Sequence, residues 1–368
     1  MTDAKGIIFA YSASPDLGDL VKQRTAASLP FAGRYRMIDF SLSSMMNAGI
    51  FDVGVIMQRD YQSLLDHLGS GKAWDMDRKS HGLRILPPFG LPEFHHGNYS
   101  GTIEALSAVI TYIEESRQNY IVLMLGSLCA NVDLTAALKQ HITSGAEITA
   151  ICTEKNISSQ HYKYVCGEDG FISEIRYSGD AEGLTALECY IVNKKFLVDM
   201  VRNAMVMNQF RFHKEALDGF FKKGGKMGVY MHEGYVSFIR TVDEYYQANK
   251  DLLKPENRRS LFPKDRPVKT KNNEITSTLY GEGAVCKNSL IADNCWINGS
   301  VENSIIFPGV AISAGAKIKD SILMRACSVE EGVELNCVIA DKNVQFSEGV
   351  TLVGSERLPI VVPKGAVI

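Results

Sequence analysis

The sequence predicts a two-domain α/β protein in which a mainly parallel sheet with flanking helices is followed by a parallel β-helix. The chain has 368 residues, more than one hydrophobic core usually supports. Short apolar runs alternate with helical patterns over most of its length, and apolar residues recur every six positions near its end. We therefore expect an α/β domain over residues 1–253, a linker over 254–274 and a β-helix domain over 275–368.

Four short runs rich in Val, Ile and Leu have the composition of strands that are buried on both faces. They are Ile7–Tyr11, Val53–Met57, Tyr120–Leu125 and Glu147–Cys152. Helical patterns lie between them, at Met37–Asn47, Tyr61–Leu68, Thr102–Arg117 and Asp133–Thr143. Such alternation favours a mainly parallel sheet with helices on both sides.

The pattern changes from Tyr162 onward. The segments "YKYVCGEDGFISEIRY" and "KMGVYMHEGYVSFI" have the pattern of short strands that add to the sheet in antiparallel fashion. The segment "TVDEYYQANKDLL" predicts a helix that closes the domain, because Thr241 and Glu244 have the spacing of a capping box. The segment from Lys254 to Asn273 is rich in proline and charge and lacks an apolar period, which predicts the linker.

Beyond the linker, apolar residues follow a period of six, which neither a strand nor a helix explains. They are Val285, Ile291 and Ile297; then Ile306, Ile312, Ile318 and Met324; then Val338, Val344 and Val350. A hexapeptide repeat forms one face of a triangular coil with its apolar residue inside, and the breaks between blocks predict loops or short insertions. Hexapeptide coils often belong to acyltransferases with a histidine base, but all eight histidines lie at or before His232. We therefore expect a structural or subunit-contact role for the coil.

The composition is that of an ordinary globular protein with a formal net charge of -3, which gives no electrostatic reason to expect a nucleic-acid partner. No apolar run approaches the roughly 20 residues that span a bilayer, and the N-terminus lacks a signal-peptide pattern. We expect a cytoplasmic protein that does not associate with membranes. The eight cysteines show no C-x-x-C spacing, which argues against metal or redox chemistry and predicts small buried hydrophobic residues.

The stretch "GIIFAYSASPDLGDLVKQRTAASLPFAGRYRMIDF", from Gly6 to Phe40, opens like a phosphate-binding enzyme. An apolar strand leads into a loop and then into a basic, helix-forming segment, where α/β proteins place phosphates. Such loops need glycines so that backbone N–H groups can approach phosphate oxygens, yet only Gly18 lies between Gly6 and Gly33. The loop therefore lacks the chemistry that its position predicts.

Four ordered motifs resemble landmarks of bacterial glucose-1-phosphate adenylyltransferases, the ADP-glucose pyrophosphorylases of glycogen synthesis. They are "LPFAGRYRMIDFSLSSMMNAGI", "SGKAWDMDR" followed by "ILPPF", "GNYSGTIEAL" and "TVDEYYQANKDLL". The similarity covers essentially the whole chain and implies a nucleotidyltransferase-type mixed, mainly parallel sheet followed by a left-handed parallel β-helix. In this family a sugar phosphate attacks the α-phosphate of ATP, which requires a glycine-rich loop, basic side chains against the triphosphate and carboxylates that hold Mg²⁺.

The resemblance also indicates which catalytic groups this chain lacks. The family's loop reads roughly G-G-x-G-T-R-L-x-P-L-T-x-x-R-A-K-P. Aligned back from Arg24, it places Asp16 at the loop arginine and Ala26 at the lysine, and a carboxylate there would repel a triphosphate. Ser127 and Phe238 occupy the positions of the two metal aspartates, and neither can replace an anionic oxygen ligand. We expect no catalytic residue, no metal site and no cofactor on this chain, with Mg²⁺ only on a catalytic partner.

The family's sugar-phosphate lysine is also absent, because "EIRYSG" occupies that region. Three acidic residues are candidates for substitute metal ligands, but each has a structural interpretation. Asp39 lies in the family's packing segment, Glu104 in a first helical turn and Asp133 at a helix N-cap. The combined losses would raise the reaction barrier enough to abolish useful activity.

We interpret the chain as a non-catalytic, GlgD-type subunit of the family that modifies the activity or the effector response of a catalytic paralogue. The resemblance implies a heterotetramer built through both domains, with a homo-oligomer of this chain as the alternative. Two other hypotheses stay open. One is an active adenylyltransferase that makes ADP-glucose with rearranged ligands, and the other is a sugar-phosphate or nucleotide sensor that acts alone.

Two groups of residues are candidates for regulation. A remnant nucleotide or effector pocket would contain Arg24, Arg34, Arg36, Gly101 and Thr102. An anionic effector would also suit a basic set in the linker, although a solvated linker is the alternative. That set contains Arg258, Arg259, Lys264 and Arg266, followed by Lys269 and Lys271. His95 and His96 are either ligands or pH-sensitive groups, or belong to a polar loop.

Overall fold

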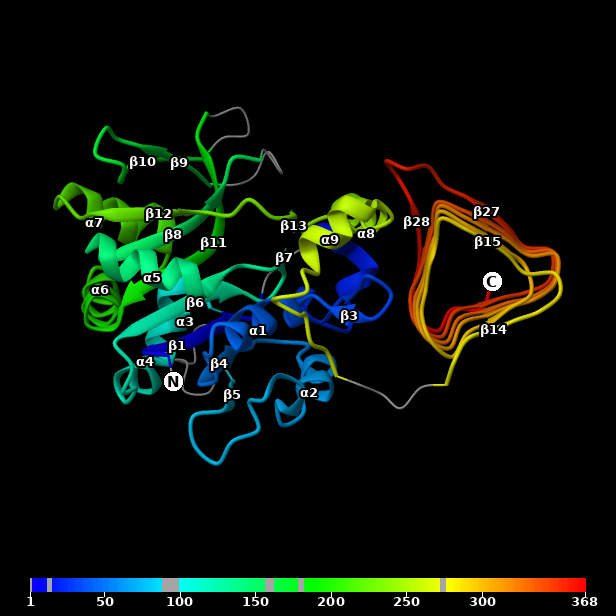
Figure 1. The fold of residues 1–368 in the computed structure, drawn as a ribbon, viewed down its shortest axis with the longest axis horizontal. Coiled ribbons are helices and arrows are strands. Elements are labelled where there is room, and N and C mark those ends of the chain that lie inside the picture. Colours follow the sequence, from blue (N-terminus) through cyan, green and yellow to red (C-terminus); the bar gives the residue numbers. More distant parts are fainter. Residues whose placement is uncertain (1, 12–14, 88–98, 156–161, 178–181, 272–275) are drawn as a thin grey trace. The chain divides into compact units, whose positions relative to one another are not determined.

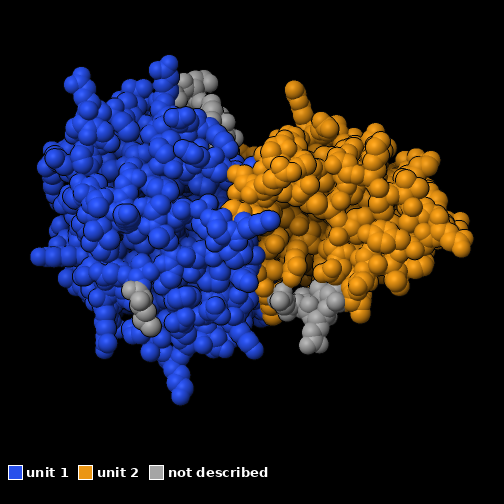
Figure 2. Space-filling view, viewed as in Figure 1, with its two compact units in different colours: residues 1–12, 38–238, 264–269 blue, residues 13–37, 239–263, 270–368 orange. Residues whose placement is uncertain are grey.

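The computed structural model describes residues 2–11, 15–87, 99–155, 162–177, 182–271 and 276–368. The chain forms two compact units, which Figure 2 colours blue and orange. The first contains residues 1–12, 38–238 and 264–269, and the second contains residues 13–37, 239–263 and 270–368. These units differ from the predicted domains 1–253 and 275–368, because Arg24 and Lys250 both bond to the β-helix.

A nine-stranded sheet forms the centre of the first unit (Figure 1). In spatial order its strands are β5 (Leu83–Leu86), β4 (Val53–Ile56), β1 (Ala4–Phe9), β6 (Tyr120–Leu125), β11 (Leu184–Asn193), β8 (Ile148–Thr153), β12 (Met227–Met231), β10 (Ile172–Tyr177) and β9 (Tyr162–Cys166). β11 and β10 run antiparallel to their neighbours, and the other strands share one direction. The predicted strands and the mainly parallel sheet are confirmed.

The helices of the first unit pack on this sheet. They are α1 (Ile38–Asn47), α2 (Gln62–Leu68), α3 (Thr102–Ala108), α4 (Ile110–Glu114), α5 (Leu134–Ser144), α6 (Lys194–Val206) and α7 (Asp218–Lys222). The single helix predicted over Thr102–Arg117 was wrong, because Val109 has a non-helical backbone (φ −114°, ψ 16°) that separates α3 from α4. Leu106, Ile113 and Val201 belong to one hydrophobic cluster with residues of β1 and β6, which holds α3, α4 and α6 against the sheet.

The segment "KMGVYMHEGYVSFI" matches its predicted antiparallel arrangement only in part, because β12 is antiparallel to β10 but parallel to β8. β12 pairs in parallel with β8, because the long helical connection through α6 and α7 lets the chain re-enter the sheet in the direction of β8. The second half forms β13 (Val236–Phe238), which pairs antiparallel with β7 (Leu128–Ala130) in a separate two-stranded sheet. The antiparallel prediction for β9 and β10 is confirmed.

The second unit contains a left-handed parallel β-helix, which appears end-on as a triangle in Figure 1. The first face holds β14 (Leu279–Tyr280), β17 (Trp296–Ile297), β20 (Ala311–Ile312), β23 (Ser328–Val329) and β26 (Gln345–Phe346). The second holds β15 (Val285–Lys287), β18 (Ser300–Glu302), β21 (Lys317–Lys319), β24 (Glu334–Asn336) and β27 (Thr351–Val353). The third holds β16 (Leu290–Ile291), β19 (Ile305–Ile306), β22 (Ile322–Leu323), β25 (Val338–Ala340) and β28 (Ile360–Val362). Parallel pairing stacks equivalent residues, so columns such as Val301, Ile318 and Leu335 form the core.

The coils are shorter than the roughly 18 residues of three hexapeptides. Most neighbouring coils pair residues that are 15 or 17 positions apart, and the shortened corners explain the breaks in the six-residue pattern. The last coil is longer, because Val338 of β25 pairs with Ile360 of β28, 22 positions later. Two positions predicted to point inward were wrong because of the shortened corners. Val285 is 61% exposed while Cys286 takes its place in the inward column, and Met324 is buried but lies 3.8 Å from Arg24 Nη1 rather than in the core cluster.

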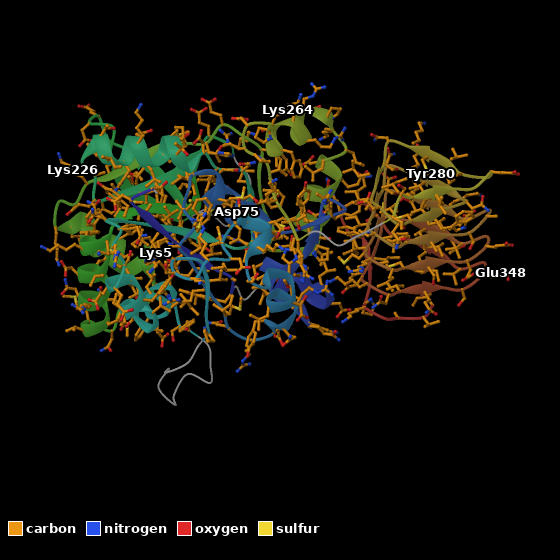
Figure 3. The ribbon with its side chains drawn as sticks, turned by 60° about the horizontal axis from the view of Figure 1, so that its bottom comes forward. Lys5, Asp75, Lys226, Lys264, Tyr280 and Glu348 are labelled. Atoms are coloured by element: carbon orange, nitrogen blue, oxygen red, sulfur yellow. The ribbon has the colours of Figure 1, made fainter. Side chains whose placement is uncertain are left out.

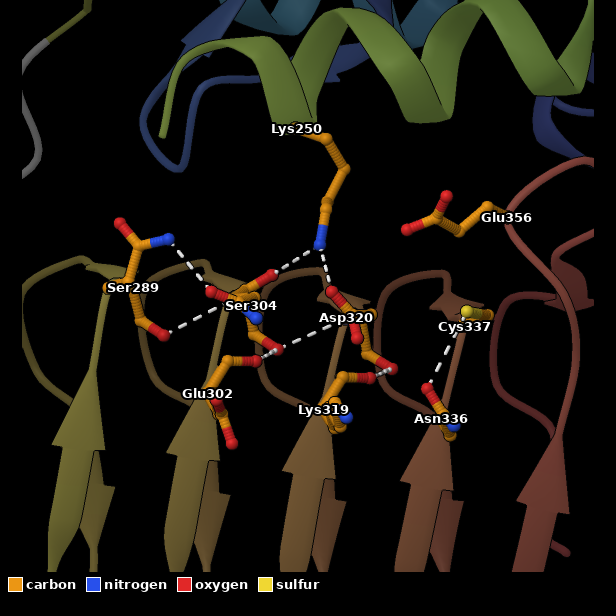
Figure 4. A network of polar contacts seen from close by, with 12 residues as sticks. Lys250, Ser289, Glu302, Ser304, Lys319, Asp320, Asn336, Cys337 and Glu356 are labelled. Atoms are coloured by element: carbon orange, nitrogen blue, oxygen red, sulfur yellow. Dashed lines mark hydrogen bonds and ion pairs between the residues drawn. The ribbon is translucent and has the colours of Figure 1, made fainter. Parts of the chain in front are cut away.

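One corner of the β-helix binds a helix of the same unit (Figure 4). Helix α8 (Val242–Asp251) begins at the predicted capping box of Thr241 and Glu244, which is confirmed. Near its end, Lys250 forms an ion pair with Asp320 and donates a hydrogen bond to the carbonyl oxygen of Asn303 at 3.0 Å. This contact attaches α8 to the coil.

The segment predicted as a linker contains a helix, α9 (Pro255–Leu261), so the linker prediction was wrong there. Pro255 begins the helix because a proline at the first helical position loses no hydrogen bond. The second unit also contains a hairpin of β2 (Pro30–Phe31) and β3 (Tyr35–Arg36). Short helical turns complete the fold: η1 (Pro15–Val21), η2 (Ala26–Ser28), η3 (Lys72–Trp74) and η5 (Phe212–Leu217).

Most cysteines match the prediction of small buried residues. Cys166 and Cys286 are exceptions because both are exposed, the second on the first coil of the β-helix, where no further coil covers it. Within the described part of the chain, none of the helices has the length and apolar character needed to cross a bilayer.

Candidate functional site

The first loop of the chain carries an aromatic side chain where the resembled family has glycine. The alignment from Arg24 places Tyr11 at the first loop glycine, a substitution that the sequence interpretation overlooked. The ring of Tyr11 meets that of Phe9 edge-on at 6.0 Å between centroids and lies 5.3 Å from that of Tyr99. Burial, with Tyr99 and Glu104 nearby, raises the pKa of Tyr11 far above its usual value, so the phenol is neutral. The neutral ring of Tyr11 therefore stands directly after β1, at the position where a glycine would let the loop backbone approach a phosphate.

Gly101 and Thr102 lie at the N-terminus of α3. A Cβ on Gly101 would stand 2.2 Å from the carbonyl oxygen of Phe210, so this position requires glycine for packing. Glu104 lies in the first turn, as predicted, and accepts a hydrogen bond from the N–H of Ser100. The glutamate therefore stabilises the start of α3, which is the structural interpretation given above.

Arg24 does not line a remnant pocket. Its side chain is 4% exposed, and Nη2 donates to both carboxylate oxygens of Asp341 at 2.8 and 2.6 Å. This corrects the expectation, because a guanidinium that already binds a carboxylate is not available to a phosphate. Within the same unit, Asp16 is exposed on η1 and Ala26 is buried in η2. Neither supplies a cation.

The two positions aligned with metal aspartates are neighbours in the first unit. Phe238 on β13 lies directly opposite Leu128 on β7, so its position is adjacent to Ser127 in the preceding turn. Phe238 is 3% exposed and packs as an apolar side chain. Mg²⁺ needs anionic oxygen ligands, which a hydroxyl and a phenyl ring do not provide, so these residues do not fit the ion. Among the residues that the structure describes, no group of three or more His, Cys, Asp or Glu side chains is placed to hold a metal.

Two further acidic candidates have structural partners. Asp39 is fully buried in α1, with Oδ1 at 2.5 Å from Nε2 of His67. Asp133 is the N-cap of α5, as predicted, where it accepts a hydrogen bond from Ala136 N–H and pairs with Arg266 at 2.9 Å. Both carboxylates therefore stabilise the fold through these partners.

An aromatic and histidine cluster lies beside β10, where the sugar-phosphate lysine is missing. The rings of Tyr162 and His213 stack with 3.8 Å between centroids and 12° between planes. Nε2 of His213 is 2.5 Å from the hydroxyl of Tyr190, which is 2.9 Å from that of Tyr164. Aromatic packing thus occupies a region for which the sequence interpretation noted only a missing lysine.

A basic cluster that the sequence interpretation missed lies around Lys342 in the second unit. Burial, together with the neighbouring guanidinium groups of Arg36 and Arg24, lowers the pKa of Lys342 to about 7. Lys364 contributes in the same direction, and Asp341 opposes it. Asp341 is bonded to Arg24 and also accepts a hydrogen bond from Lys342 N–H at 2.6 Å, which places Lys342 beside this buried ion pair.

Arg34 lies on the turn of the β2–β3 hairpin, at a cavity of about 300 Å³. The cavity belongs to the second unit, and its wall includes Tyr35, Lys271, Asp293 and Pro308. The ring of Tyr35 stacks on that of Phe262 with 5.0 Å between centroids, which supports the hairpin. The two predicted arginines of this hairpin thus face different surroundings, Arg34 the cavity and Arg36 the cluster around Lys342.

The predicted cluster of linker cations divides between different surroundings. Arg258 and Arg259 lie on α9, and Arg258 donates to the carbonyl oxygen of Leu252 at 2.6 Å. Lys264 is exposed on the first unit, as Figure 3 shows, and Arg266 is paired with Asp133. His95 and His96 lie outside the described residues, so their prediction stays untested.

Family models match both parts of the chain. A model described as "Nucleotidyl transferase" matches residues 5–167, and one described as "GlmU-like, C-terminal hexapeptide" matches residues 274–357. These matches agree with the sheet of the first unit and the coil of the second.

Curated proteins resemble the chain over nearly all its length. It is 31% identical to "Glycogen biosynthesis protein GlgD" of Bacillus subtilis (strain 168), over 98% of this chain and 96% of that protein. It is 34% identical to "Glucose-1-phosphate adenylyltransferase" of Clostridium botulinum (strain Alaska E43 / Type E3), over 87% of this chain and 84% of that protein. The corresponding protein of Clostridium perfringens (strain SM101 / Type A) is 30% identical over 98% of this chain and 95% of its own length.

Proposed function

Because the chain belongs to the glucose-1-phosphate adenylyltransferase family, we propose that it is a non-catalytic subunit that modulates a catalytic paralogue in glycogen biosynthesis. The observation that carries the proposal is the pair of neighbouring positions Ser127 and Phe238. They replace both expected metal ligands, and the buried phenyl ring excludes water and cations from its position. In this proposal Mg²⁺ binds only the catalytic partner, and the two chains form a cytoplasmic hetero-oligomer.

Other features support the loss of chemistry. Tyr11 replaces the first loop glycine with a packed ring, and Asp16 puts a negative charge where the family has an arginine. The alternative of an active enzyme with rearranged ligands is less well supported. All three of its candidate ligands have structural partners. Asp39 is bonded to His67, Glu104 accepts from Ser100 N–H, and Asp133 caps α5 and pairs with Arg266.

The basic cluster of Arg36, Lys342 and Lys364 supports a regulatory role. Cations that crowd one another destabilise their own charged forms, and a phosphate among them removes that repulsion. We propose an anionic effector, of the phosphorylated-sugar class, at this cluster. A stand-alone sensor would use the same cluster without a partner.

Co-expression of this chain with its catalytic paralogue tests the proposal. The two chains should co-purify, and the mixture should differ from the paralogue alone in rate or in response to phosphorylated effectors. Lys342→Met should keep the complex but remove that effector response. Failure to co-purify, together with phosphate binding by the isolated chain, would favour the stand-alone sensor.

A further inference from the structure

An apolar groove lies between α6 and the segment formed by η5 and α7 in the first unit (Figure 1). Its volume is about 190 Å³, and Phe196, Met200, Ala204 and Phe220 contribute to its walls. The rings of Phe196 and Phe220 meet edge-on with 5.1 Å between centroids, which fixes one part of the wall. A cavity of about 150 Å³ with apolar walls holds a benzene molecule, so this groove has room for one large apolar side chain.

A glycine in the wall of the groove has no explanation within the chain. Gly219 lies inside α7 and is not among the residues with positive φ, so its backbone conformation does not require glycine. A Cβ at this position would meet no heavy atom of the described residues within 4 Å. Glycine also stabilises a helix less than alanine does. The missing side chain therefore keeps the wall open to a group from outside the chain.

Two apolar side chains stand in solvent at the end of α6, beside the groove. Val206 is 84% exposed and Met207 is 60% exposed, and Met207 also lines the groove. An exposed apolar patch next to an apolar groove is typical of an interaction surface, and methionine adapts its shape to a partner. The same surface thus carries both a projecting apolar side chain and a space that fits one.

The charged residues of the groove point to the partner. Asp199 of α6 and Lys223, which directly follows α7, are exposed and come from the two opposing walls. A twofold axis through the groove would bring Asp199 of each copy of the chain to Lys223 of the other copy. A partner that carries only one sign of charge would be repelled by one of the two walls. The pattern therefore favours a second copy of this chain.

We propose that the groove is an isologous interface between two copies of this chain. Val206 of each copy enters the groove of the other over Gly219, and two pairs of Asp199 with Lys223 flank this apolar centre. The 13 residues of α6 span about 20 Å, so two such helices packed across the axis extend the contact beyond the groove. This inference does not depend on the proposed regulatory function, because it concerns contact between identical chains.

Sedimentation equilibrium of the whole chain over a range of concentrations tests the interface. Val206→Asp places a charge without a partner at the apolar centre, so it should raise the dissociation constant of this contact at least about tenfold. Ile142→Asp is the matched control, because Ile142 is also apolar and 52% exposed on a helix of the same unit but lies outside the groove. It should leave association unchanged. If the coil makes a second contact, loss of this one halves the mass of the assembly.

Filling the groove tests the role of Gly219 without adding a charge. Gly219→Leu should weaken association at least about tenfold, because its side chain occupies the space that Val206 of the second copy needs. Gly219→Ala adds only a Cβ and should have a much smaller effect. Both variants should fold at least as well as the original chain, since each favours the helix and meets open space. Equal association of the two variants would overturn docking over Gly219.

A charge exchange tests the twofold arrangement. Asp199→Lys should weaken association because it faces Lys223 of the second copy, and the double variant Asp199→Lys/Lys223→Asp should restore it. Salt should reduce both effects. A double variant that stays dissociated would overturn the twofold arrangement. Association that survives both Val206→Asp and Gly219→Leu would overturn the interface, and a chain that is monomeric at every concentration would overturn the second copy as its occupant.

Discussion

Arg24 and Asp341 are 317 positions apart in the sequence and form a buried ion pair in which one guanidinium nitrogen donates to both carboxylate oxygens. Their side chains are 4% and 2% exposed. The retained arginine of a former phosphate loop thus holds the N-terminal segment of the second unit to the β-helix. Retention of this residue reflects assembly of the fold and not binding of a nucleotide.

Arg24→Met should destabilise the chain by about 3–5 kcal/mol, because it leaves Asp341 buried without its cation. Urea unfolding measures the loss. The double variant Arg24→Met/Asp341→Asn should recover most of it, since no buried charge is left unpaired. Lys317→Ala, which breaks an exposed pair with Glu334, is the control and should change stability little, because solvent screens that pair. Equal costs for the buried and exposed pairs would contradict the anchoring role.

Lys342 should make stability depend on pH. Its pKa falls from 10.5 to about 7 on folding, so the folded chain releases the proton first as pH rises. The buried charge destabilises the folded chain to its full extent below about pH 7, and this destabilisation disappears as the pH rises toward 10.5. Lys342→Met should therefore stabilise the chain most at about pH 6 and less at about pH 9. The exposed Lys364→Met should show a smaller change with pH, and a pH-independent gain for Lys342→Met would contradict the assignment.

Anion binding at this cluster should take up a proton. A bound phosphate favours the charged form of Lys342, so affinity should fall as the pH rises above about 7. Calorimetry in buffers of different ionisation enthalpy detects the uptake. Lys342→Met should abolish it. Binding without proton uptake would place the anion elsewhere.

A serine ladder should stabilise the coil (Figure 4). Ser304 Oγ accepts from Ser321 N–H at 3.0 Å, and Ser321 Oγ accepts from Val338 N–H at 3.1 Å. Both serines are fully buried, so Ser321→Ala leaves a buried N–H without a partner and should cost about 1–3 kcal/mol. Ser347→Ala, at an exposed position of the coil, is the control and should cost less when thermal unfolding is compared. Equal costs would mean that the hydrogen bonds of the serine ladder do not stabilise the coil.

Thr270→Val should stabilise the chain by about 1 kcal/mol, because it removes a buried hydroxyl that lacks a partner while keeping the shape of the side chain. The midpoint of urea unfolding measures the gain. Thr276→Val is the control, since Thr276 donates to Asn294 at 2.8 Å on an exposed site. Destabilisation by Thr270→Val would show that the hydroxyl has a partner.

Local sequence patterns predicted most of the elements, because strands of Val and Ile, the capping box at Thr241 and the six-residue repeat are local signals. The direction of β12 and the split at Val109 depend on tertiary packing, which local patterns do not encode. The predicted register of the coil was wrong where corners are shortened, as at the exposed Val285.

The candidate site was predictable only where a family motif exists. Ser127 and Phe238 could be located by alignment, and the pairing of β7 with β13 sets them side by side. The partner of Arg24 and the charge environment of Lys342 could not be predicted, because neither lies in a motif and both depend on residues distant in the sequence. Tyr11 could have been found by reading the aligned loop one residue further back.

The most direct test of the central claim is Mg²⁺-dependent formation of ADP-glucose by the isolated chain with saturating ATP and glucose 1-phosphate. We predict no product above the level without enzyme, and no gain from Tyr11→Gly, because Ser127 and Phe238 still supply no metal ligand. Product formation that requires Mg²⁺ and disappears in an Asp39→Asn, Glu104→Gln or Asp133→Asn variant would contradict the account, since it would show an active enzyme with rearranged ligands.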